Sequence, residues 1–307
     1  MTNYLVEPAP HIKSKITTQK VMLHVIIALL PSVMASTYIY GLRALLMIVI
    51  CSACCVLSEL IFEKITKRPR TINDLSAVVT GILLAFNLPP TLPFYMAAIG
   101  SVVAIVAVKQ LFGGIGQNFA NPAITARIVL MLSFSSYMTT WVRPFYYTMS
   151  ADAVSSATPL VSEEPLEFFD LFFAKSGCIG ECCNAALILG GLYLIFTRII
   201  TPVVPIAYIG TVALLTWISG GDVLSQVLSG GLVLGAFFMA TDYATTPIRT
   251  NGKLIFAVGC GLLTFVIRNY GSMPEGVSYS ILIMNIITPY IDKLTVSHPF
   301  GAKKEAK

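Results

Sequence analysis

Residues 44–64 read Ala-Leu-Leu-Met-Ile-Val-Ile-Cys-Ser-Ala-Cys-Cys-Val-Leu-Ser-Glu-Leu-Ile-Phe-Glu-Lys, an apolar run in which the first charged residue is Glu59. A helix needs about 20 apolar residues to cross the hydrocarbon core of a bilayer. Similar runs recur along the chain, and Gly, Pro, Asn or charged residues separate them. They predict ten transmembrane helices, at residues 21–41, 44–64, 75–88, 94–112, 123–142, 184–200, 202–218, 223–240, 254–270 and 279–292.

The composition also indicates a membrane protein. Of the 307 residues, 56% are hydrophobic and 11% are charged, and the mean hydropathy is +0.79. Because about 25% of the residues in a soluble domain are charged, we expect an all-α polytopic membrane protein. The net charge of +5 is scattered between apolar runs instead of forming a basic patch, which excludes nucleic-acid binding as the first interpretation.

The basic residues predict the orientation, because cytoplasmic loops of membrane proteins are enriched in Lys and Arg. Residues 1–19 lack a continuous apolar core, so they are not expected to be a signal peptide. With the N-terminus in the cytoplasm, 16 of the 20 basic residues, including Lys109 and Arg127, lie on the cytoplasmic side. The remaining four are Arg43, Arg143, Lys175 and Arg268. We therefore expect both termini in the cytoplasm.

The connection between the fifth and sixth spans is much longer than the others. It covers residues 143–183 on the outer side and separates a first membrane half, 1–142, from a second, 184–307. Its acidic residues predict a solvated loop with an amphipathic piece at 166–173. Long loops often carry function, so this loop is also a candidate site.

The two halves share a weak internal similarity. Gly81-Ile-Leu-Leu-Ala-Phe-Asn87 is followed by Pro93, and Gly235-Ala-Phe-Phe-Met-Ala-Thr241 is followed by Pro247. Because each half has five spans, related halves would be inverted relative to each other, as in many transporters. We expect two inverted five-helix repeats, an architecture similar to that of the urea transporter, with polar breaks that enter from opposite faces.

A further polar break precedes the fifth span and reads Gly113-Gly114-Ile115-Gly116-Gln117-Asn118-Phe119-Ala120-Asn121-Pro122. Glycines permit a close backbone approach, and side-chain amides both donate and accept hydrogen bonds. The break is not a dinucleotide-binding fingerprint, because no strand precedes it and the glycine spacing differs. A simple helix start would explain Pro122, and Asn121 as its cap, but not Gln117 and Asn118.

The long loop contains Asp152-Ala153-Val154-Ser155-Ser156-Ala157-Thr158. This stretch resembles the flavinylation motif, Asp-x-x-Ser/Thr-Gly-Ala-Thr, in which a flavin transferase joins FMN through its phosphate to the last threonine. Ser156 stands where the motif usually has glycine. A threonine hydroxyl can form a phosphoester, and the small neighbours leave room for the nucleotide.

Three segments together carry a wider resemblance: the motif in the loop, the stretch 113–123, and Ala240-Thr-Asp-Tyr-Ala-Thr-Thr-Pro247. Over essentially its whole length the chain resembles the family that contains the D subunit of the Rnf electron-transport complex and the B subunit of the Na⁺-translocating NADH:quinone reductase. Its length and short N-terminal region are closer to the Rnf member of the family.

The resemblance implies a membrane subunit of a ferredoxin:NAD⁺ oxidoreductase that couples electron transfer to Na⁺ or H⁺ movement across the bacterial plasma membrane. The implied partners are membrane lipid, the other Rnf subunits, A, B, C, E and G, and a flavin transferase during maturation.

The resemblance also implies two flavins. Thr158 would carry covalent FMN on the outer face, within the recognition sequence Asp152, Ser155, Ser156 and Ala157. A noncovalent riboflavin would bind among the spans, and the breaks at 113–122 and 241–247 are its candidate site. The candidate residues are Gly113, Gly114, Gly116, Gln117, Asn118, Asn121, Thr241, Asp242 and Thr245.

Charged residues within membrane segments are functional candidates, although those near helix ends usually extend to the interface. Glu59, Lys109 and Asp242 all fall near cytoplasmic ends. We expect Lys109 to extend to the interface. For Asp242, in a polar break, a role in orienting a flavin or binding a cation is an equal alternative to extending to the interface.

Three of the seven cysteines, Cys178, Cys182 and Cys183, cluster before the sixth span. Three thiols, two of them adjacent, are poor spacing for a four-thiolate site. We expect incidental thiols, and a share in a cluster with another subunit stays open.

Two other classes of function stay open. A passive channel or carrier would share the urea-transporter-like architecture, would not need Thr158 and would conduct solute alone. A structural scaffold would tolerate substitution of Gln117, Asn118 and Asp242.

Overall fold

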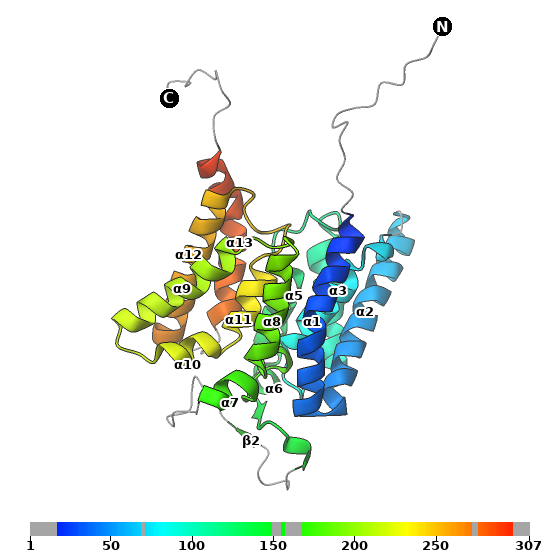
Figure 1. Ribbon diagram of the computed structural model, residues 1–307. Helices are drawn as coiled ribbons and strands as arrows, with labels where there is room; N and C mark the ends of the chain where they lie inside the picture. Colours follow the sequence, from blue (N-terminus) through cyan, green and yellow to red (C-terminus); the bar gives the residue numbers. More distant parts are fainter. Residues whose placement is uncertain (1–16, 69–70, 149–154, 157–167, 272–275, 297–307) are drawn as a thin grey trace, which may run out of the picture.

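The computed structural model describes residues 17–68, 71–148, 155–156, 168–271 and 276–296. Its helices are stacked side by side, and the start of α1 and the end of α13 lie at the same end of the molecule (Figure 1). We call this end the N face and the opposite end, where α7 and the strands lie, the loop face.

The long helices are α1 Thr18–Tyr40, α2 Leu42–Thr66, α8 Asn184–Phe196, α9 Val203–Ile218, α12 Thr250–Tyr270 and α13 Gly276–Thr295. By length and composition α1, α2 and α12 can cross a membrane. Large apolar side chains on the flanks, such as Met34, Leu132 and Ile206, are exposed. These features confirm the predicted helical membrane class.

Several membrane segments are shorter. They are α3 Ser76–Phe86, α4 Phe94–Val102 continued by the π-helix η2 Val103–Gln110, α5 Pro122–Ser133, α10 Val223–Leu228, and α11 Leu232–Leu234 continued by the π-helix η6 Gly235–Met239. The smaller elements are η1 Ile72–Asp74, α6 Ser135–Met138, β1 Trp141–Val142, η3 Tyr146–Thr148, β2 Ser155–Ser156, α7 Phe168–Phe173 and η5 Ile179–Glu181. The two-residue strands β1 and β2 pair antiparallel and were not predicted.

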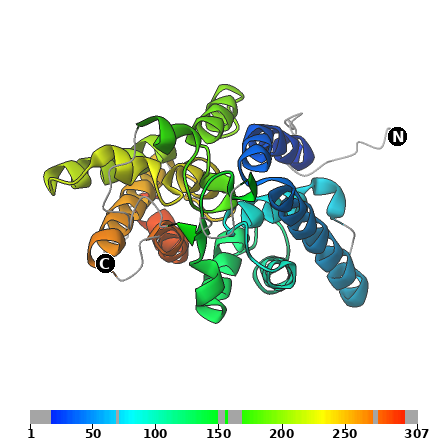
Figure 2. The same ribbon diagram turned by 90° about the horizontal axis from the view of Figure 1, so that it is seen from below.

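The two halves of the chain pack directly on each other. Helix α1 contacts α8, and α5 contacts α13. Seen from the loop face, the other first-half helices lie on one side of α8 and α5, and α9, α12 and α13 lie on the other (Figure 2). Gly190 makes the α1–α8 approach possible, because a Cβ there would lie 2.0 Å from the Ala28 carbonyl oxygen.

Two predicted spans are wrong as continuous helices. The span expected at 123–142 ends at Ser133, and a short helix and strand β1 follow. The span expected at 223–240 breaks between α10 and α11, because Gly230 and Gly231 both adopt positive φ, at 62° and 68°. Consecutive left-handed residues cannot continue a right-handed helix.

The break between α10 and α11 is stabilised by two cations, the buried Lys175 and the half-buried Arg268. The Lys175 ammonium donates to the Leu228 carbonyl oxygen, and Arg268 Nη2 donates to the Ser229 carbonyl oxygen at 2.8 Å. These carbonyls have lost their helical donors, so the two cations satisfy them at the negative end of α10.

The expectation of a solvated loop is wrong for residues 175–183, which are all buried. We call them the re-entrant segment. The Ile179 amide donates to the Leu88 carbonyl oxygen at 3.0 Å, and a Cβ on Gly180 would lie 2.4 Å from Phe86 Cβ. The end of the loop therefore packs against the end of α3, inside the protein.

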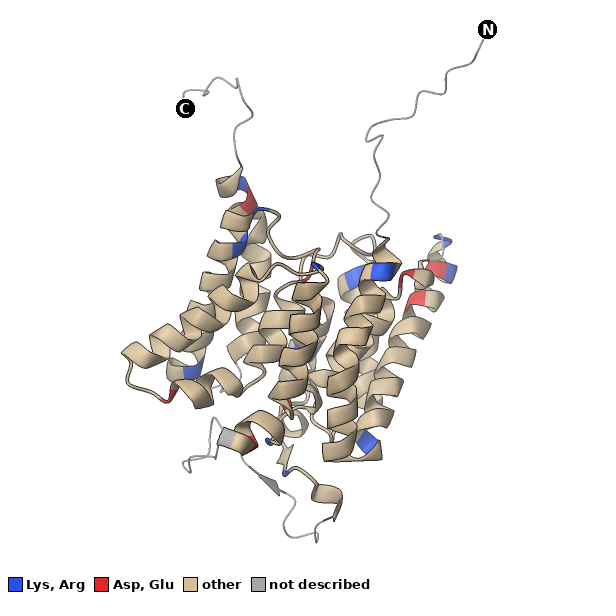
Figure 3. Ribbon diagram, viewed as in Figure 1, with Lys and Arg blue, Asp and Glu red and all other residues tan. Residues whose placement is uncertain are grey.

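Charged residues concentrate at the N face and loop face, with a few between them (Figure 3). Arg127, which was counted on the cytoplasmic side of the predicted span 123–142, lies within α5 and is 4% exposed. Glu59, Lys109, Lys175 and Glu181 are also buried. These residues need partners inside the protein, and the candidate site contains one such pair.

Candidate functional site

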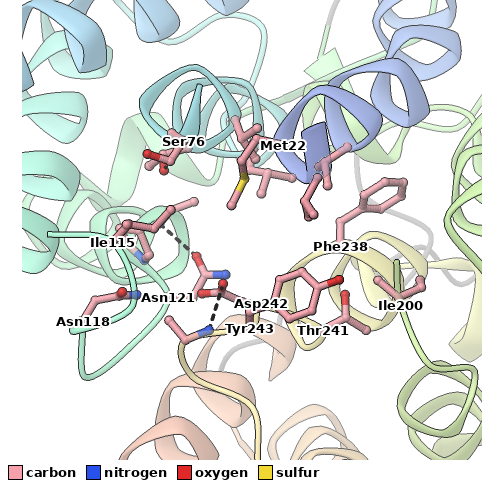
Figure 4. Close-up of a pocket in the computed structure, with 18 of the residues that line it drawn as sticks. Met22, Ser76, Ile115, Asn118, Asn121, Ile200, Phe238, Thr241, Asp242 and Tyr243 are labelled. Carbon is pink, nitrogen blue, oxygen red and sulfur yellow. Dashed lines mark hydrogen bonds between the residues drawn. The ribbon is translucent and has the colours of Figure 1, made fainter. Parts of the chain in front are cut away.

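A pocket lies near the N face, between the two halves of the chain (Figure 4). Its walls come from α1, α3, η2, α8 and η6 and from the two polar breaks that follow η2 and η6. The lining residues are Val21, Met22, Val25, Ser76, Val79, Thr80, Leu83, Lys109, Ile115, Asn118, Asn121, Pro122, Ala123, Leu194, Ile199, Ile200, Phe237, Phe238, Thr241, Asp242, Tyr243 and Ala244.

The pocket brings together the two breaks that the sequence singled out. Asn118 and Asn121 come from the first break, and Thr241 and Asp242 from the second, more than 100 residues later. Figure 4 shows all four around the same space. These are four of the nine residues that were candidates for the riboflavin site.

Asn121 connects the two breaks. Its Oδ1 accepts hydrogen bonds from the Ala123 and Ile124 amides, at 3.0 and 3.4 Å, which confirms the predicted cap of α5. Its Nδ2 donates to the Met239 carbonyl oxygen at 3.3 Å. One side chain therefore starts a helix and fixes the end of η6.

Asp242 is held by its own turn. Its Oδ1 accepts from the Ala244 amide, and its Oδ2 accepts from the Thr245 hydroxyl, both at 3.4 Å. Burial raises the pKa of Asp242 above its ordinary value, and hydrogen bonds from Ala244, Thr245 and Asn118 oppose that rise. The carboxyl group therefore gains a proton more easily than an exposed aspartate does.

The other candidates in the breaks shape the site without lining it. Gly113, Gly114 and Gly116 have φ of 121°, 102° and 83°, conformations that glycine adopts without strain. Gln117 is exposed, and Thr245 is buried behind Asp242. Thr245 also accepts a hydrogen bond on its carbonyl oxygen from the Thr288 hydroxyl, at 3.0 Å.

The expected flavinylation motif lies largely outside the described residues, which include neither Asp152 nor Ala157 nor Thr158. Ser155 and Ser156 form strand β2, in register with Val142 and Trp141. The part of the motif that the structure describes is thus anchored to the chain that follows α6.

Sequence reasoning missed an ion pair at the pocket. Lys109 was expected to extend to the interface, but it is 3% exposed, and its Nζ lies 2.7 Å from Glu59 Oε1. The prediction failed because Glu59, on α2, gives the ammonium a buried partner. The sequence did hold a signal for this ion pair, because Glu59 and Lys109 were both predicted near the cytoplasmic ends of their spans.

The sequence also did not identify the apolar walls. Val79 and Leu83 lie on α3, and Phe237 and Phe238 on η6. Mostly apolar walls with a few polar groups are typical of pockets that bind cofactors. Both π-helices, η2 and η6, contribute lining residues, and π-helical turns are frequent at functional sites.

The described residues contain no group of three or more His, Cys, Asp or Glu arranged to hold a metal ion. Cys178, Cys182 and Cys183 are buried free thiols. Burial raises the pKa of Cys178 to about 12.

Comparison with known proteins finds relatives that are named as D subunits of ion-translocating oxidoreductase complexes. The chain is 46% identical to the D subunit of the Na⁺-translocating ferredoxin:NAD⁺ oxidoreductase complex of Acetobacterium woodii, over 99% of this chain and 98% of the relative. It is 41% identical to the D subunit of the proton-translocating ferredoxin:NAD⁺ oxidoreductase complex of Clostridium ljungdahlii, over 98% and 97%. It is 36% identical to the D subunit of the ion-translocating oxidoreductase complex of Stutzerimonas stutzeri, over 95% and 94%.

The sequence profile described as the NQR2, RnfD, RnfE family matches residues 5–301, nearly the whole chain. The pocket, the two breaks and the buried ion pair all fall inside this match. The chain is therefore a multi-pass membrane protein that belongs to the NQR2, RnfD, RnfE family.

Proposed function

We propose that this chain is the D subunit of an ion-translocating ferredoxin:NAD⁺ oxidoreductase complex and carries flavin within the membrane. Full-length similarity to D subunits of such complexes supports the assignment. Two of these relatives are named for different ions, so the proposal covers either Na⁺ or H⁺. The proposed partners are the other Rnf subunits, A, B, C, E and G.

The pocket is the proposed site of a noncovalent riboflavin, and the meeting of the two polar breaks in it is the observation that carries this proposal. The residues fit the group: apolar side chains such as Leu83 and Phe238 can flank a planar ring. Asn118, Asn121 and Asp242 offer donors and acceptors for its polar edge and hydroxyl groups. A bound flavin would supply one-electron chemistry, and the protein would hold and orient it.

A second flavin, FMN, is proposed as a phosphoester on Thr158, attached by a flavin transferase. The sequence motif supports this assignment, and Asp152, Ser155, Ser156 and Ala157 form its recognition sequence. Strand β2 lies at the loop face, away from the pocket (Figure 1). Two flavins near opposite faces would let electrons pass across the membrane.

The proposed topology has about ten membrane spans in two inverted five-helix repeats. Two short helices support it: α3 runs inward from the N face and η6 runs inward from the loop face, and their ends meet where Asn87 Nδ2 lies 3.7 Å from Met239 Sδ. The basic residues at the N face support a cytoplasmic location for it (Figure 3). The loop face is then outside.

The covalent flavin is tested on a denaturing gel after coexpression with a flavin transferase. The wild-type band should fluoresce, Thr158→Ala should be dark, and Thr148→Ala, at an exposed threonine in the same connection, should fluoresce like wild type. A dark wild-type band would overturn the assignment of Thr158.

The noncovalent flavin is tested by extracting it from purified complex that carries Thr158→Ala. We expect extractable riboflavin, and its loss when Asn121→Leu disrupts the pocket. Complex without extractable flavin would overturn the pocket assignment and leave that of Thr158 intact.

A further inference from the structure

Lys109 is the one cation among the described residues that line the pocket, and Asp242 is the one carboxylate. The Lys109 side chain is 4% exposed, and Glu59 is fully buried. A buried ammonium beside a ligand pocket acts at low effective dielectric, where its effect on a bound charge is large.

The π-helix η2 fixes the position of Lys109. Adjacent side chains on a helix usually diverge, yet Lys109 Nζ and Gln110 Nε2 both donate to Glu59 Oε1, each at 2.7 Å. Lys109 also donates to the Ser76 hydroxyl at 2.6 Å, and Ser76 lines the pocket too. The ammonium is therefore held at the wall of the pocket.

The negative charge of Glu59 is shared between two donors, Lys109 and Gln110. The Thr71 hydroxyl lies 3.1 Å from Glu59 Oε1, but it donates its single proton to the nearer Glu63 Oε1. Glu59 Oε2 is buried and has no hydrogen-bond partner among the described residues. Because Gln110 shares the carboxylate with Lys109, the ammonium retains an attraction for a negative charge in the pocket.

We propose that Lys109 raises the redox potential of the flavin in this pocket and orients its pyrimidine edge, and that Glu59 lowers that potential. This inference rests on the proposed riboflavin site. A flavin bound here would supply one-electron chemistry, with the electron coming from its redox partner and no bond broken. The Lys109 ammonium at the pocket wall would stabilise the added negative charge more than the neutral ring.

A purely structural explanation is that Lys109 only neutralises Glu59. The two explanations differ in the sign of their effects. If the pair acts on the flavin through its charges, removing the cation lowers the potential and removing the carboxylate raises it. A structural pair would disturb the pocket in the same way whichever partner is removed.

The test is a redox titration of the noncovalent flavin, followed by its absorbance, in purified complex that carries Thr158→Ala. Lys109→Met should favour the oxidised flavin about ten-fold, which equals 59 mV for one electron. Glu59→Gln should shift the equilibrium in the opposite direction. Lys64→Met removes an exposed lysine of α2 that does not line the pocket, and it should leave the potential unchanged.

Shifts of the same sign in Lys109→Met and Glu59→Gln, or no shift in either, would overturn the role of Lys109. If Lys109→Met does not assemble, the neutral pair Glu59→Gln with Lys109→Met replaces it. This double variant must then show a lower potential than Glu59→Gln alone. Absence of flavin from the complex with intact Lys109 would instead overturn the proposed riboflavin site.

Discussion

Arg127 Nη1 donates a hydrogen bond to Asn87 Oδ1 at 2.8 Å, across 40 residues of sequence. Arg127 also donates to the Ser278 hydroxyl at 3.2 Å and to Cys178 Sγ at 3.5 Å. One buried guanidinium therefore connects α5 with the end of α3, with α13 and with the re-entrant segment. Buried cations need such partners, and losing one is costly.

We expect Asn87→Leu to destabilise the protein by about 1–3 kcal/mol, because it removes the acceptor from a buried guanidinium. Arg127→Met should destabilise it as well. The double variant should cost less than the sum of the two, since neither polar group is left facing an apolar side chain. Unfolding of purified protein in detergent with added denaturant measures each change. Strict additivity would show that the contact contributes little.

The approach of α1 and α8 gives a second prediction. Gly190→Ala should destabilise the protein by roughly 1–3 kcal/mol, because its Cβ would meet the Ala28 carbonyl oxygen, which is fixed in helix α1. Gly210→Ala, on α9, has no atom within 4 Å of the new Cβ. It should be neutral or stabilise by up to about 1 kcal/mol. Thermal unfolding of the two variants compares them, and equal effects would contradict the packing.

Thiol labelling tests whether the re-entrant segment is buried. A membrane-impermeant maleimide should leave Cys178 and Cys182 unmodified in native protein at pH 7, because both are buried and burial raises the pKa of Cys178 to about 12. Phe169→Cys, at an exposed position of α7, should react readily. Peptide mapping by mass spectrometry identifies the sites. Rapid labelling of Cys178 would show that the segment is solvated.

The raised pKa of Asp242 predicts that the stability of the protein depends on pH. Burial raises its pKa above 3.8 in the folded protein, so the folded state binds a proton at a higher pH than the unfolded chain. The stability that this proton contributes is fully present below the ordinary value and is lost as pH rises through the raised pKa. Because only wild type loses this contribution, the stability of Asp242→Asn relative to wild type should increase as the pH rises from 4 to 8.

Thermal unfolding of flavin-free protein at several pH values measures the difference. Asp222→Asn is the matched control, because Asp222 is an exposed cap of α10 and asparagine caps equally well. A difference between Asp242→Asn and wild type that stays constant with pH would contradict the raised pKa.

Part of the candidate site was predictable from local sequence. The breaks at 113–122 and 241–247 stood out because amides, glycines and an aspartate interrupt apolar runs, and the structure places both at one pocket. The cap formed by Asn121 was predictable for the same reason, since a cap depends on neighbours within one turn. The exposure of Gln117 was not predictable from local sequence, because it depends on the path of the whole turn.

By itself, the sequence determined that this chain is a helical membrane protein and which segments are apolar, because the transfer of a segment into lipid depends mainly on its own side chains. Only the tertiary structure decided that Lys109 pairs with Glu59, that Arg127 meets Asn87, and that residues 175–183 turn back into the protein. Each of these depends on which distant segments pack together. Packing places a distant part of the chain beside a buried charge and so supplies its partner. No local pattern specifies which distant part that is.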